Sequence, residues 1–334
     1  MLRQHELSHA NTLRLPCRAE YYARPGTLRE LRDTLGQAAA AERKVTILGG
    51  GSNVLLPADL PGLVITPDLR QWWLTGAKGE SHVGLHVGAG VAWHPLVMEM
   101  AARGYWGLEN LALIPGLCGA APIQNIGAYG VELGDVLEAV QIMEIASGEL
   151  RWLDRAECRL GYRDSIFKHE LAGRAVITRL VLRLSRVPTP RLGYGDLARR
   201  VGSEPSALDV ARAVCAIREE KLPDPAELAN AGSFFKNPLV PRDQAEQLLE
   251  RYPNMPNFPQ PGGITKLAAG WLIERCGLKG WRCGAFGVHE RQALVLVHFG
   301  GGTRQELLEV AGRIAATVEK EFGVTLEPEP RLLE

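Results

Sequence analysis

The chain contains five segments whose residue types and spacing could do chemistry. The first is a run of three glycines, 49–51, followed by Ser52 and Asn53. Glycines after a strand leave backbone N–H groups open to a phosphate, because no side chain blocks the approach. The third glycine of a GxGxxG dinucleotide turn is missing and an apolar strand follows, which excludes a nicotinamide-type turn. The run therefore predicts either a phosphate contact or a plain tight turn.

A second segment, residues 114–130, is rich in small residues. Small residues let the backbone pass close to a flat ligand. Gln124 and Asn125 offer amide donors and acceptors to a heterocycle or a phosphate. Without the other segments, this stretch is more typical of a close-packed structural loop.

The third segment, residues 161–168, places Arg163 among aromatic side chains. A guanidinium is a planar fork that matches a carboxylate, so Arg163 could be a buried cation for an anionic substrate. The alternative is a surface arginine paired with Asp164.

The remaining two segments carry Ser233 and Glu329. Gly232 before Ser233 permits a sharply turned, exposed hydroxyl, but the setting is not GxSxG, so a hydrolase nucleophile is not supported. Glu329 stands between two prolines that stiffen the chain on both sides. The alternatives are a serine that serves a turn or a cap, and a solvated terminal tail.

Composition limits the protein classes that remain. The chain has 334 residues, of which 46% are hydrophobic. This length suggests two domains or three small ones, and a chain of this size can bury a large enough core to fold without a disulfide or a structural metal. Its 38 basic residues balance its 38 acidic residues, which excludes a general electrostatic nucleic-acid binder. The six cysteines form no CxxC pair and the histidines have no metal-ligand spacing, so we expect reduced thiols and no metal.

The chain shows no signal-peptide pattern and no apolar run of membrane-spanning length, so we expect a soluble, cytoplasmic protein. Periodicity predicts helices and strands without regular alternation, which favours the α+β class. The predicted helices cover residues 27–41, 93–103, 207–221, 242–251, 266–276 and 304–322. The predicted strands cover residues 44–48, 64–66, 83–88, 140–144, 151–153, 175–184 and 293–299.

Taken together, the five segments closely resemble the UDP-N-acetylenolpyruvoylglucosamine reductases of bacterial peptidoglycan synthesis. The resemblance covers nearly the whole chain. Its most specific strings are GGGSNVLL at 49–56, PIQNIGAYGVEL at 122–133, GYRDSIFKHE at 161–170, KLPDP at 221–225, AGSFFKNP at 231–238, KLAAGWLIE at 266–274 and LEPE at 326–329. The loop at 192–197 is similar to the tyrosine-bearing loop of the type I subclass.

The chain departs from the family pattern at two places. Ala120 and Ala121 stand where many relatives have two serines, so a side-chain hydroxyl contact to the flavin is absent there. Pro330 follows Glu329 where a β-branched residue is common, which leaves the carboxylate in place.

The resemblance implies a vanillyl-alcohol-oxidase/PCMH-type FAD-binding fold in two subdomains plus a C-terminal α+β substrate-binding domain. The two subdomains would be residues 1–71 and 72–220. Residues 221–323 would close over the nucleotide sugar, and the tail 324–334 would pack back near the first subdomain.

The resemblance also implies the reaction. NADPH, the co-substrate, reduces a non-covalent FAD, and flavin N5 then delivers hydride to UDP-N-acetylglucosamine enolpyruvate. We expect no nucleic-acid or membrane partner, and a monomer, as is usual in the family.

The implied catalytic residues are Arg163 and Glu329, which stabilise the charged intermediate at the substrate carboxylate, and Ser233, which donates the proton. Glu329 is expected to be protonated or to share a proton. Lys221 and Asn237 would bind the diphosphate. The other implied substrate contacts are Tyr162, which would orient Arg163, Tyr194, which would cover the substrate, and Gln292. The implied cofactor contacts are Gly49, Gly50, Gly51, Ser52, Asn53, Pro115, Gly116, Gly119, Gln124, Asn125, Gly127, Ala128 and Tyr129.

Two other functions remain open. An oxidase of alcohols or sugars with the same flavoprotein architecture would share the glycine run but would need none of the KLPDP, AGSFFKNP and LEPE strings. A non-catalytic flavoprotein that binds nucleotide sugars would hold ligand without reduction of its flavin by NADPH. The presence of Arg163, Ser233 and Glu329 together argues against a loss of activity.

Overall fold

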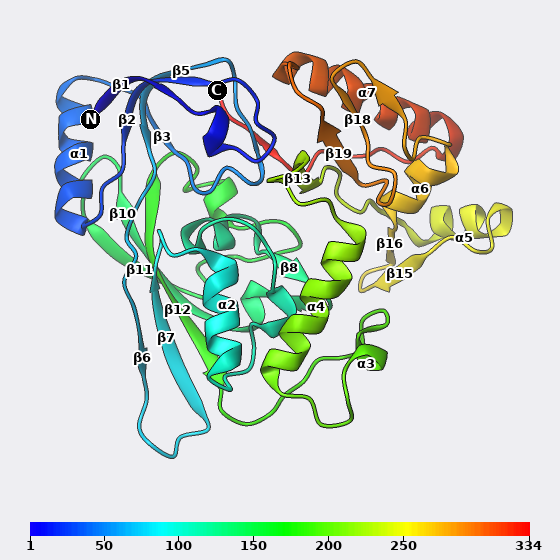
Figure 1. Cartoon of the computed structure of the whole chain (residues 1–334), viewed down its shortest axis with the longest axis horizontal. Coiled ribbons are helices and arrows are strands. Elements are labelled where there is room, and N and C mark those ends of the chain that lie inside the picture. The colour runs from blue at the N-terminus through cyan, green and yellow to red at the C-terminus, as the bar shows by residue number, and fades with distance from the viewer. The chain divides into compact units, whose positions relative to one another are not determined.

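The computed structural model describes all residues, 1–334 (Figure 1). The chain forms two compact units, and each unit is assembled from separate stretches of sequence. The first unit contains residues 1–5, 19–51 and 60–220, and the second contains residues 6–18, 52–59 and 221–334. No helix combines the length and the apolar character that crossing a membrane requires.

The first unit begins with a small sheet covered by one helix. Its four strands follow the order β1 (Leu2–Glu6), β2 (Arg18–Ala23), β5 (Asp59–Ile65) and β3 (Val45–Ile47). Helix α1 (Leu28–Ala40) starts at Thr27, whose side chain accepts a hydrogen bond from the N–H of Glu30, as is usual for an N-cap. Its leucines recur every three to four residues, so Leu31 and Leu35 share one buried face with Leu63 and Ile65 of β5.

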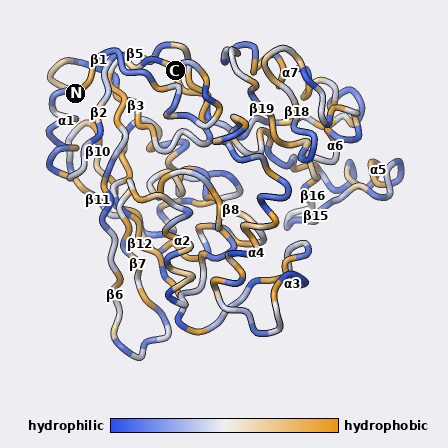
Figure 2. The backbone as a smooth tube through the Cα atoms, viewed as in Figure 1, coloured by the Kyte–Doolittle hydropathy of each residue, from blue (hydrophilic) through white to orange (hydrophobic).

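A second sheet makes up most of the first unit. It is antiparallel, with the order β11 (Leu150–Asp154), β10 (Leu137–Glu144), β12 (Ala175–Ser185), β7 (His82–Gly88) and β6 (Trp72–Thr75). Residues alternate between its two faces, so the valines and the leucine of β7 are buried while His82 and His86 are only half-buried. Helices α2 (Trp93–Ala102) and α4 (Ala207–Lys221) contribute buried residues to the same hydrophobic core as β7, β10 and β12 (Figure 1). Hydrophobic stretches coincide with β10, β12 and α2 in Figure 2.

The segment between α2 and β10 contains no long element. It contains the 3₁₀ helices η2 (Glu109–Leu111), η3 (Cys118–Gln124) and η4 (Leu133–Asp135) and the short strands β8 (Gly127–Ala128) and β9 (Val131–Glu132). The other short elements are η1 (Ser8–Ala10), η5 (Ile166–Lys168) and α3 (Leu197–Arg200). This part of the sequence has little regular hydrophobic periodicity, and the chain accordingly forms only short elements here.

The second unit combines two small sheets with three helices. One sheet has the order β13 (Ala229–Ser233), β19 (Val295–His298), β18 (Phe286–Val288) and β17 (Arg282–Cys283), and the other has the order β14 (Leu239–Pro241), β16 (Ile264–Leu267) and β15 (Asn257–Gln260). The helices are α5 (Arg242–Arg251), α6 (Ala269–Arg275) and α7 (Arg304–Phe322). Thr303 and Glu306 form a capping box at the start of α7, whose apolar face packs against Phe286 and Leu296.

The C-terminal tail pairs with a strand from the first part of the sequence. Strand β20 (Arg331–Leu332) lies parallel to β4 (Val54–Leu55), and both belong to the second unit. The α+β class is confirmed. The helix predicted at 266–276 begins only at Ala269, because Lys266 and Leu267 pair with strands on both sides of β16.

Candidate active site

The glycine run and the second glycine-rich segment lie against each other in the first unit. A Cβ on Gly50 would stand 2.8 Å from the Cα of Gly116, and a Cβ on Gly49 would stand 3.1 Å from the Cβ of Ala120. On Gly119, a Cβ would stand 2.5 Å from the Cβ of Ala89. Backbones approach this closely only where side chains are missing. The glycines therefore form a strip of bare backbone, which suits a flat or phosphorylated group.

Backbone hydrogen bonds hold this strip to the start of α2. The N–H of Trp93 donates to the carbonyl of Gly116 at 3.0 Å. The N–H groups of Cys118 and Gly119 donate to Val91 and Ala89 at 2.8 and 2.9 Å. The loop 115–120 is thus anchored by the segment that precedes the helix.

Asn125 is engaged with its own loop. Its Nδ2 donates to Glu132 Oε2 at 2.8 Å and to the carbonyl of Gly161 at 3.1 Å, and its Oδ1 accepts from the N–H of Gly134 at 2.9 Å. The side chain is 2% exposed. Both amide hydrogens are used inside the protein, so the side chain joins three loops and donates no further hydrogen bond in this arrangement.

Several bulky residues of this region adopt a left-handed backbone. Leu113, Asn125, Tyr129 and Arg163 have φ values of 58°, 45°, 50° and 54°. Such conformations cost on the order of 1–3 kcal/mol each and persist only where the surrounding contacts impose them. Because these strained backbone conformations lie between residues 113 and 163, this region is a candidate functional site.

Arg163 and its neighbours are held by backbone groups. Its Nη2 donates to the carbonyl of Gly127 at 3.1 Å, and its guanidinium carbon lies 5.6 Å from the centroid of the Tyr162 ring. Lys168 Nζ donates to the carbonyl of Arg163 at 2.9 Å. Asp164, the expected partner in the alternative interpretation, has its carboxylate hydrogen-bonded to His169 at 2.8 Å.

Arg218 on α4 is a residue that the sequence analysis missed. Its Nε is buried and has no hydrogen-bond partner. Burial lowers the pKa of its guanidinium and the nearby Arg163 acts in the same direction, whereas Tyr129 and Cys215 oppose them. Arg218 is therefore a buried guanidinium whose Nε has no hydrogen-bond partner within the protein, which makes it a candidate contact for an anion.

A sequence signal for Arg218 did exist. It follows Val214 by four residues in a predicted helix, which places it on the same face as that buried valine. A cation on an apolar helix face is unusual and points to a buried role.

Tyr194 lies near the same group of residues. Its ring meets the ring of Tyr129 edge to face, with centroids 5.6 Å apart. Burial raises the pKa of the Tyr129 phenol. The first unit therefore places the Tyr194 ring against Tyr129, two residues from the Gly127 carbonyl that Arg163 contacts.

In the second unit, the C-terminal arm 326–329 lies beside the serine segment. The N–H of Glu329 donates to the carbonyl of Phe234 at 2.8 Å, and Phe235 pairs with Pro328. Glu329 thus stands opposite Phe234, one residue from Ser233. Gly232, at φ 70°, makes the sharp turn before the serine.

Asn53 also contacts this arm. Its amide donates to the carbonyl of Glu329 at 3.4 Å, and its own carbonyl accepts from the N–H of Arg331 at 3.0 Å. Ser52 and Asn53 belong to the second unit, whereas the three glycines before them belong to the first. The structure therefore places Asn53 at the arm of Glu329.

The other predicted substrate contacts lie at ends of elements in the second unit. Asn237 Oδ1 accepts from the N–H of Ala269 at 3.0 Å, which caps the first turn of α6 and leaves the amide hydrogens to donate elsewhere. Gln292 Oε1 accepts from the N–H of Leu294 at 3.3 Å. Lys221 is exposed at the end of α4.

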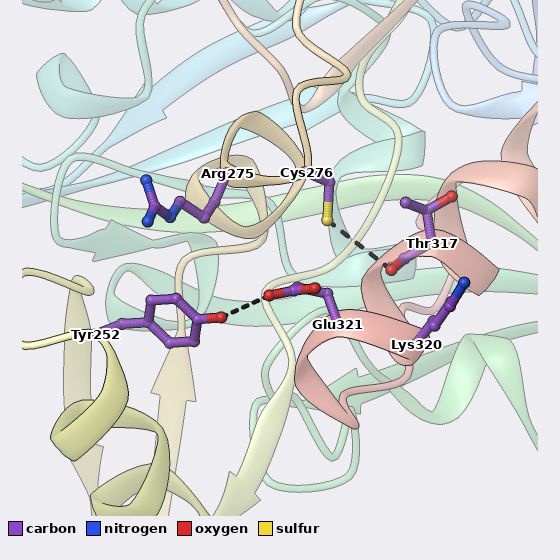
Figure 3. Close-up of a pocket in the computed structure, with 6 residues that line it drawn as sticks. All are labelled: Tyr252, Arg275, Cys276, Thr317, Lys320 and Glu321. Carbon is purple, nitrogen blue, oxygen red and sulfur yellow. Dashed lines mark hydrogen bonds between the residues drawn. The ribbon is translucent and has the colours of Figure 1, made fainter.

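A pocket of about 420 Å³ lies elsewhere in the second unit (Figure 3). It is lined by Tyr252, Arg275, Cys276, Thr317, Lys320 and Glu321. The Tyr252 hydroxyl donates to Glu321 at 2.6 Å. No predicted site residue lines this pocket, so we do not include it in the candidate active site.

Two family models match the chain. The model for the C-terminal domain of UDP-N-acetylenolpyruvoylglucosamine reductase matches residues 224–333, and a model for an FAD binding domain matches residues 19–154. The second match confirms the FAD-binding class of the fold.

Relatives with the same enzyme name align along nearly the whole chain. The UDP-N-acetylenolpyruvoylglucosamine reductase of Chromobacterium violaceum is 49% identical over 98% of this chain and 97% of its own. The Pseudomonas aeruginosa enzyme is 47% identical over 99% and 98%. The crystal structure of the Thermus caldophilus reductase superposes with a TM-score of 0.69, at 26% identity and full coverage of both chains. The chain therefore belongs to the UDP-N-acetylenolpyruvoylglucosamine reductase family and is an FAD-binding oxidoreductase.

Proposed function

We propose that the protein reduces UDP-N-acetylglucosamine enolpyruvate to UDP-N-acetylmuramate, with NADPH as the electron source. The shared enzyme name of relatives at 45–49% identity supports the substrate class. The observation that carries the proposal is the backbone pairing of the Glu329 arm with the segment that follows Ser233, which brings these two stretches of the second unit next to each other.

FAD fits the strip of bare backbone formed by residues 49–51 and 115–120. The backbone of Gly50 packs on that of Gly116 with no room for a side chain, so these two glycine-rich loops lie close enough together to contact the same ligand. When bound, FAD accepts hydride from NADPH and passes it to the substrate. Residues 1–71 and 72–220 would hold FAD and residues 221–323 the substrate.

A Gly50→Ala substitution is expected to weaken FAD binding. Its Cβ would collide with the backbone of Gly116, and overpacking of this kind costs about 1–3 kcal/mol. We expect FAD to dissociate from the variant roughly tenfold more readily, measured by flavin fluorescence after dilution.

Gly36→Ala is the matched control for that experiment. Its Cβ would meet nothing within 4 Å and it lies inside α1, so the change should raise the free energy of unfolding by about 0.5–1 kcal/mol without loss of FAD. Equal FAD retention by the two variants would contradict the proposed flavin contact.

The substrate would direct its carboxylate to Arg163 and Arg218. Hydride addition to the terminal carbon of the enolpyruvyl group leaves negative charge on the adjacent carbon, and resonance spreads that charge onto the carboxylate. Fixed guanidiniums stabilise this charged species more than the starting alkene, which lowers the barrier. Glu329, in its protonated form, would donate a hydrogen bond to the same carboxylate.

Ser233 would complete the reaction by giving its hydroxyl proton to the carbon next to the carboxylate. A serine hydroxyl is a weak acid, so it acts only on a strongly basic centre held within hydrogen-bond reach. The turn at Gly232 and the pairing of Phe234 with Leu294 and Glu329 fix the backbone around the serine.

The diphosphate would be bound by Lys221 and by the amide hydrogens of Asn237, whose oxygen is already used at α6. Gln292 would contact the substrate. Tyr162 would orient Arg163, and Tyr194 would cover the bound substrate and exclude water.

Arg218→Met tests the second guanidinium. Loss of a hydrogen bond to a charged group costs about 1.5–3 kcal/mol, so kcat/KM for the enolpyruvyl substrate should fall roughly ten- to hundredfold, with a higher KM and a lower kcat. The fold should tolerate methionine, because Nε has no partner to lose. Arg212→Met, at an exposed position of the same helix, should leave the KM unchanged.

Anaerobic stopped-flow absorbance tests the proposed function as a whole. We expect NADPH to bleach the bound flavin and UDP-N-acetylglucosamine enolpyruvate to restore its colour promptly. Recolouring only by oxygen would indicate an oxidase-like relative with another substrate. A flavin that NADPH never bleaches would contradict NADPH as the electron source.

A further inference from the structure

The loop that carries Tyr194 has little structure of its own. No helix or strand lies between the end of β12 at Ser185 and the start of α3 at Leu197, and the stretch contains two prolines and two glycines. Tyr194 is 52% exposed, and its ring contact is with Tyr129. A side chain on such a loop loses conformational freedom when it closes on a ligand, so prior anchoring favours binding.

The first anchor of the loop is Asn110, which is 1% exposed. Its Nδ2 donates to the carbonyl of Tyr129 at 2.9 Å and to the carbonyl of Arg191 at 2.8 Å. The start of the loop is therefore tied to the residue whose ring Tyr194 contacts. Arg191 also lies 3.5 Å from a carboxylate oxygen of Asp135.

The second anchor is a group of three charged residues, which we call the Arg200 clamp: Asp196, Arg200 and Glu220. Arg200 Nε donates to Asp196 Oδ2 at 3.0 Å. Its Nη1 and Nη2 donate to the two carboxylate oxygens of Glu220 at 2.6 and 2.7 Å. All three guanidinium nitrogens are used, and the Arg200 side chain is 31% exposed.

The clamp joins the loop to α4. Asp196 is two residues past Tyr194, and Glu220 is two residues past Arg218. Single exposed ion pairs contribute little to stability, but a planar fork held by two carboxylates fixes orientation. The clamp therefore sets the position of the Tyr194 loop relative to the helix that carries Arg218.

We infer that Arg200 is a positioning residue that holds the Tyr194 loop against α4 in the arrangement that covers the substrate. The inference rests on the proposed function, in which Tyr194 covers the substrate. Arg200 acts through Tyr194 and takes no part in the chemistry.

Arg200→Gln tests this role. Loss of the clamp lowers the fraction of molecules whose loop is ready to bind, so the KM for the enolpyruvyl substrate should rise about three- to tenfold. The kcat and the rate of flavin reduction by NADPH should stay within about twofold. Arg103→Gln, which breaks the 2.6 Å pair with Glu99 on α2, is the matched control and should change neither.

Two further variants separate positioning from charge. Arg200→Lys keeps the charge but cannot form the fork, so it should recover less than half of the lost affinity. In a Tyr194→Ala background, Arg200→Gln should add no further loss. Full recovery by lysine, an added loss in that background, or an unchanged KM in Arg200→Gln would each overturn the inference.

Hydrogen exchange tests the clamp without any substrate. The N–H of Leu197 donates to Tyr194 and the N–H of Arg199 donates to Asp196, so both amides should exchange several-fold faster in Arg200→Gln than in Arg103→Gln. Equal exchange rates of these amides in the two variants would contradict the inference that the Arg200 clamp holds the loop. Faster exchange in a protein that never turns over the substrate would count against the proposed function alone.

Discussion

Replacing Ser233 with alanine is expected to leave flavin reduction by NADPH within about twofold of the wild-type rate. The second half-reaction, reoxidation of the flavin by the enolpyruvyl substrate, should slow by about 10²–10⁴-fold, the usual contribution of a positioned general acid. The two half-reactions differ because only the second requires a proton on carbon. Anaerobic stopped-flow absorbance measures both rates on the same sample.

Replacing Ser233 with alanine should leave the backbone hydrogen bonds around this position unchanged. The contacts that hold the segment are backbone bonds, Phe234 N–H to Leu294 at 2.7 Å and Glu329 N–H to Phe234 at 2.8 Å, and the substitution removes neither. Ser81→Ala, at an exposed loop serine, is the control. If both half-reactions of Ser233→Ala slowed equally, the serine would not be the proton donor.

Glu329→Gln is expected to lower kcat by about 10²–10³-fold, because the glutamine amide can donate an N–H but cannot share a proton with the developing anion as the carboxyl group would. The KM should change much less, because the lost interaction strengthens only as charge develops on the substrate carboxylate. Glutamine has nearly the same shape, and the backbone N–H that bonds to Phe234 is kept. Steady-state kinetics with varied enolpyruvyl substrate measures both parameters.

Glu327→Gln provides the comparison within the same arm. Its carboxylate pairs with Lys236 at 3.0 Å and is 70% exposed, so its loss should affect kcat by less than about twofold. A Glu329→Gln variant whose KM rises while kcat stays normal would reduce Glu329 to a binding residue. Equal losses in the two variants would point to damage to the arm rather than to chemistry.

The periodic segments were predictable because their information is local. Leucines at helical spacing after a capping threonine are enough to predict α1, and apolar residues at alternate positions are enough to predict β7. The prediction was wrong where long-range pairing overrode a local pattern. Lys266 and Leu267 read as the start of a helix, yet hydrogen bonds to β14 and β15 on both sides make them a strand.

The candidate site likewise has features that the sequence predicted and features that only the structure shows. Strings such as AGSFFKNP and LEPE identify residues by type, and that identification needed no coordinates. Arg218 was missed, since a charge in a helix gives its face but not its neighbours. A contact of Asn125 with the cofactor stays a prediction, and only the structure shows that its side chain is hydrogen-bonded to Glu132, Gly134 and Gly161.

The sequence by itself determined the α+β class, the family and the FAD requirement, and it supplied the residues that we propose for the reaction. Only the tertiary structure decided which of these residues are neighbours: Glu329 beside the Ser233 segment, Gly50 on Gly116, and Tyr194 against Tyr129. The physical reason is the separation along the chain over which each kind of contact acts. Helix and strand periodicity reports contacts within a few residues, whereas these pairs depend on hydrogen bonds, close packing and burial between segments far apart in the chain.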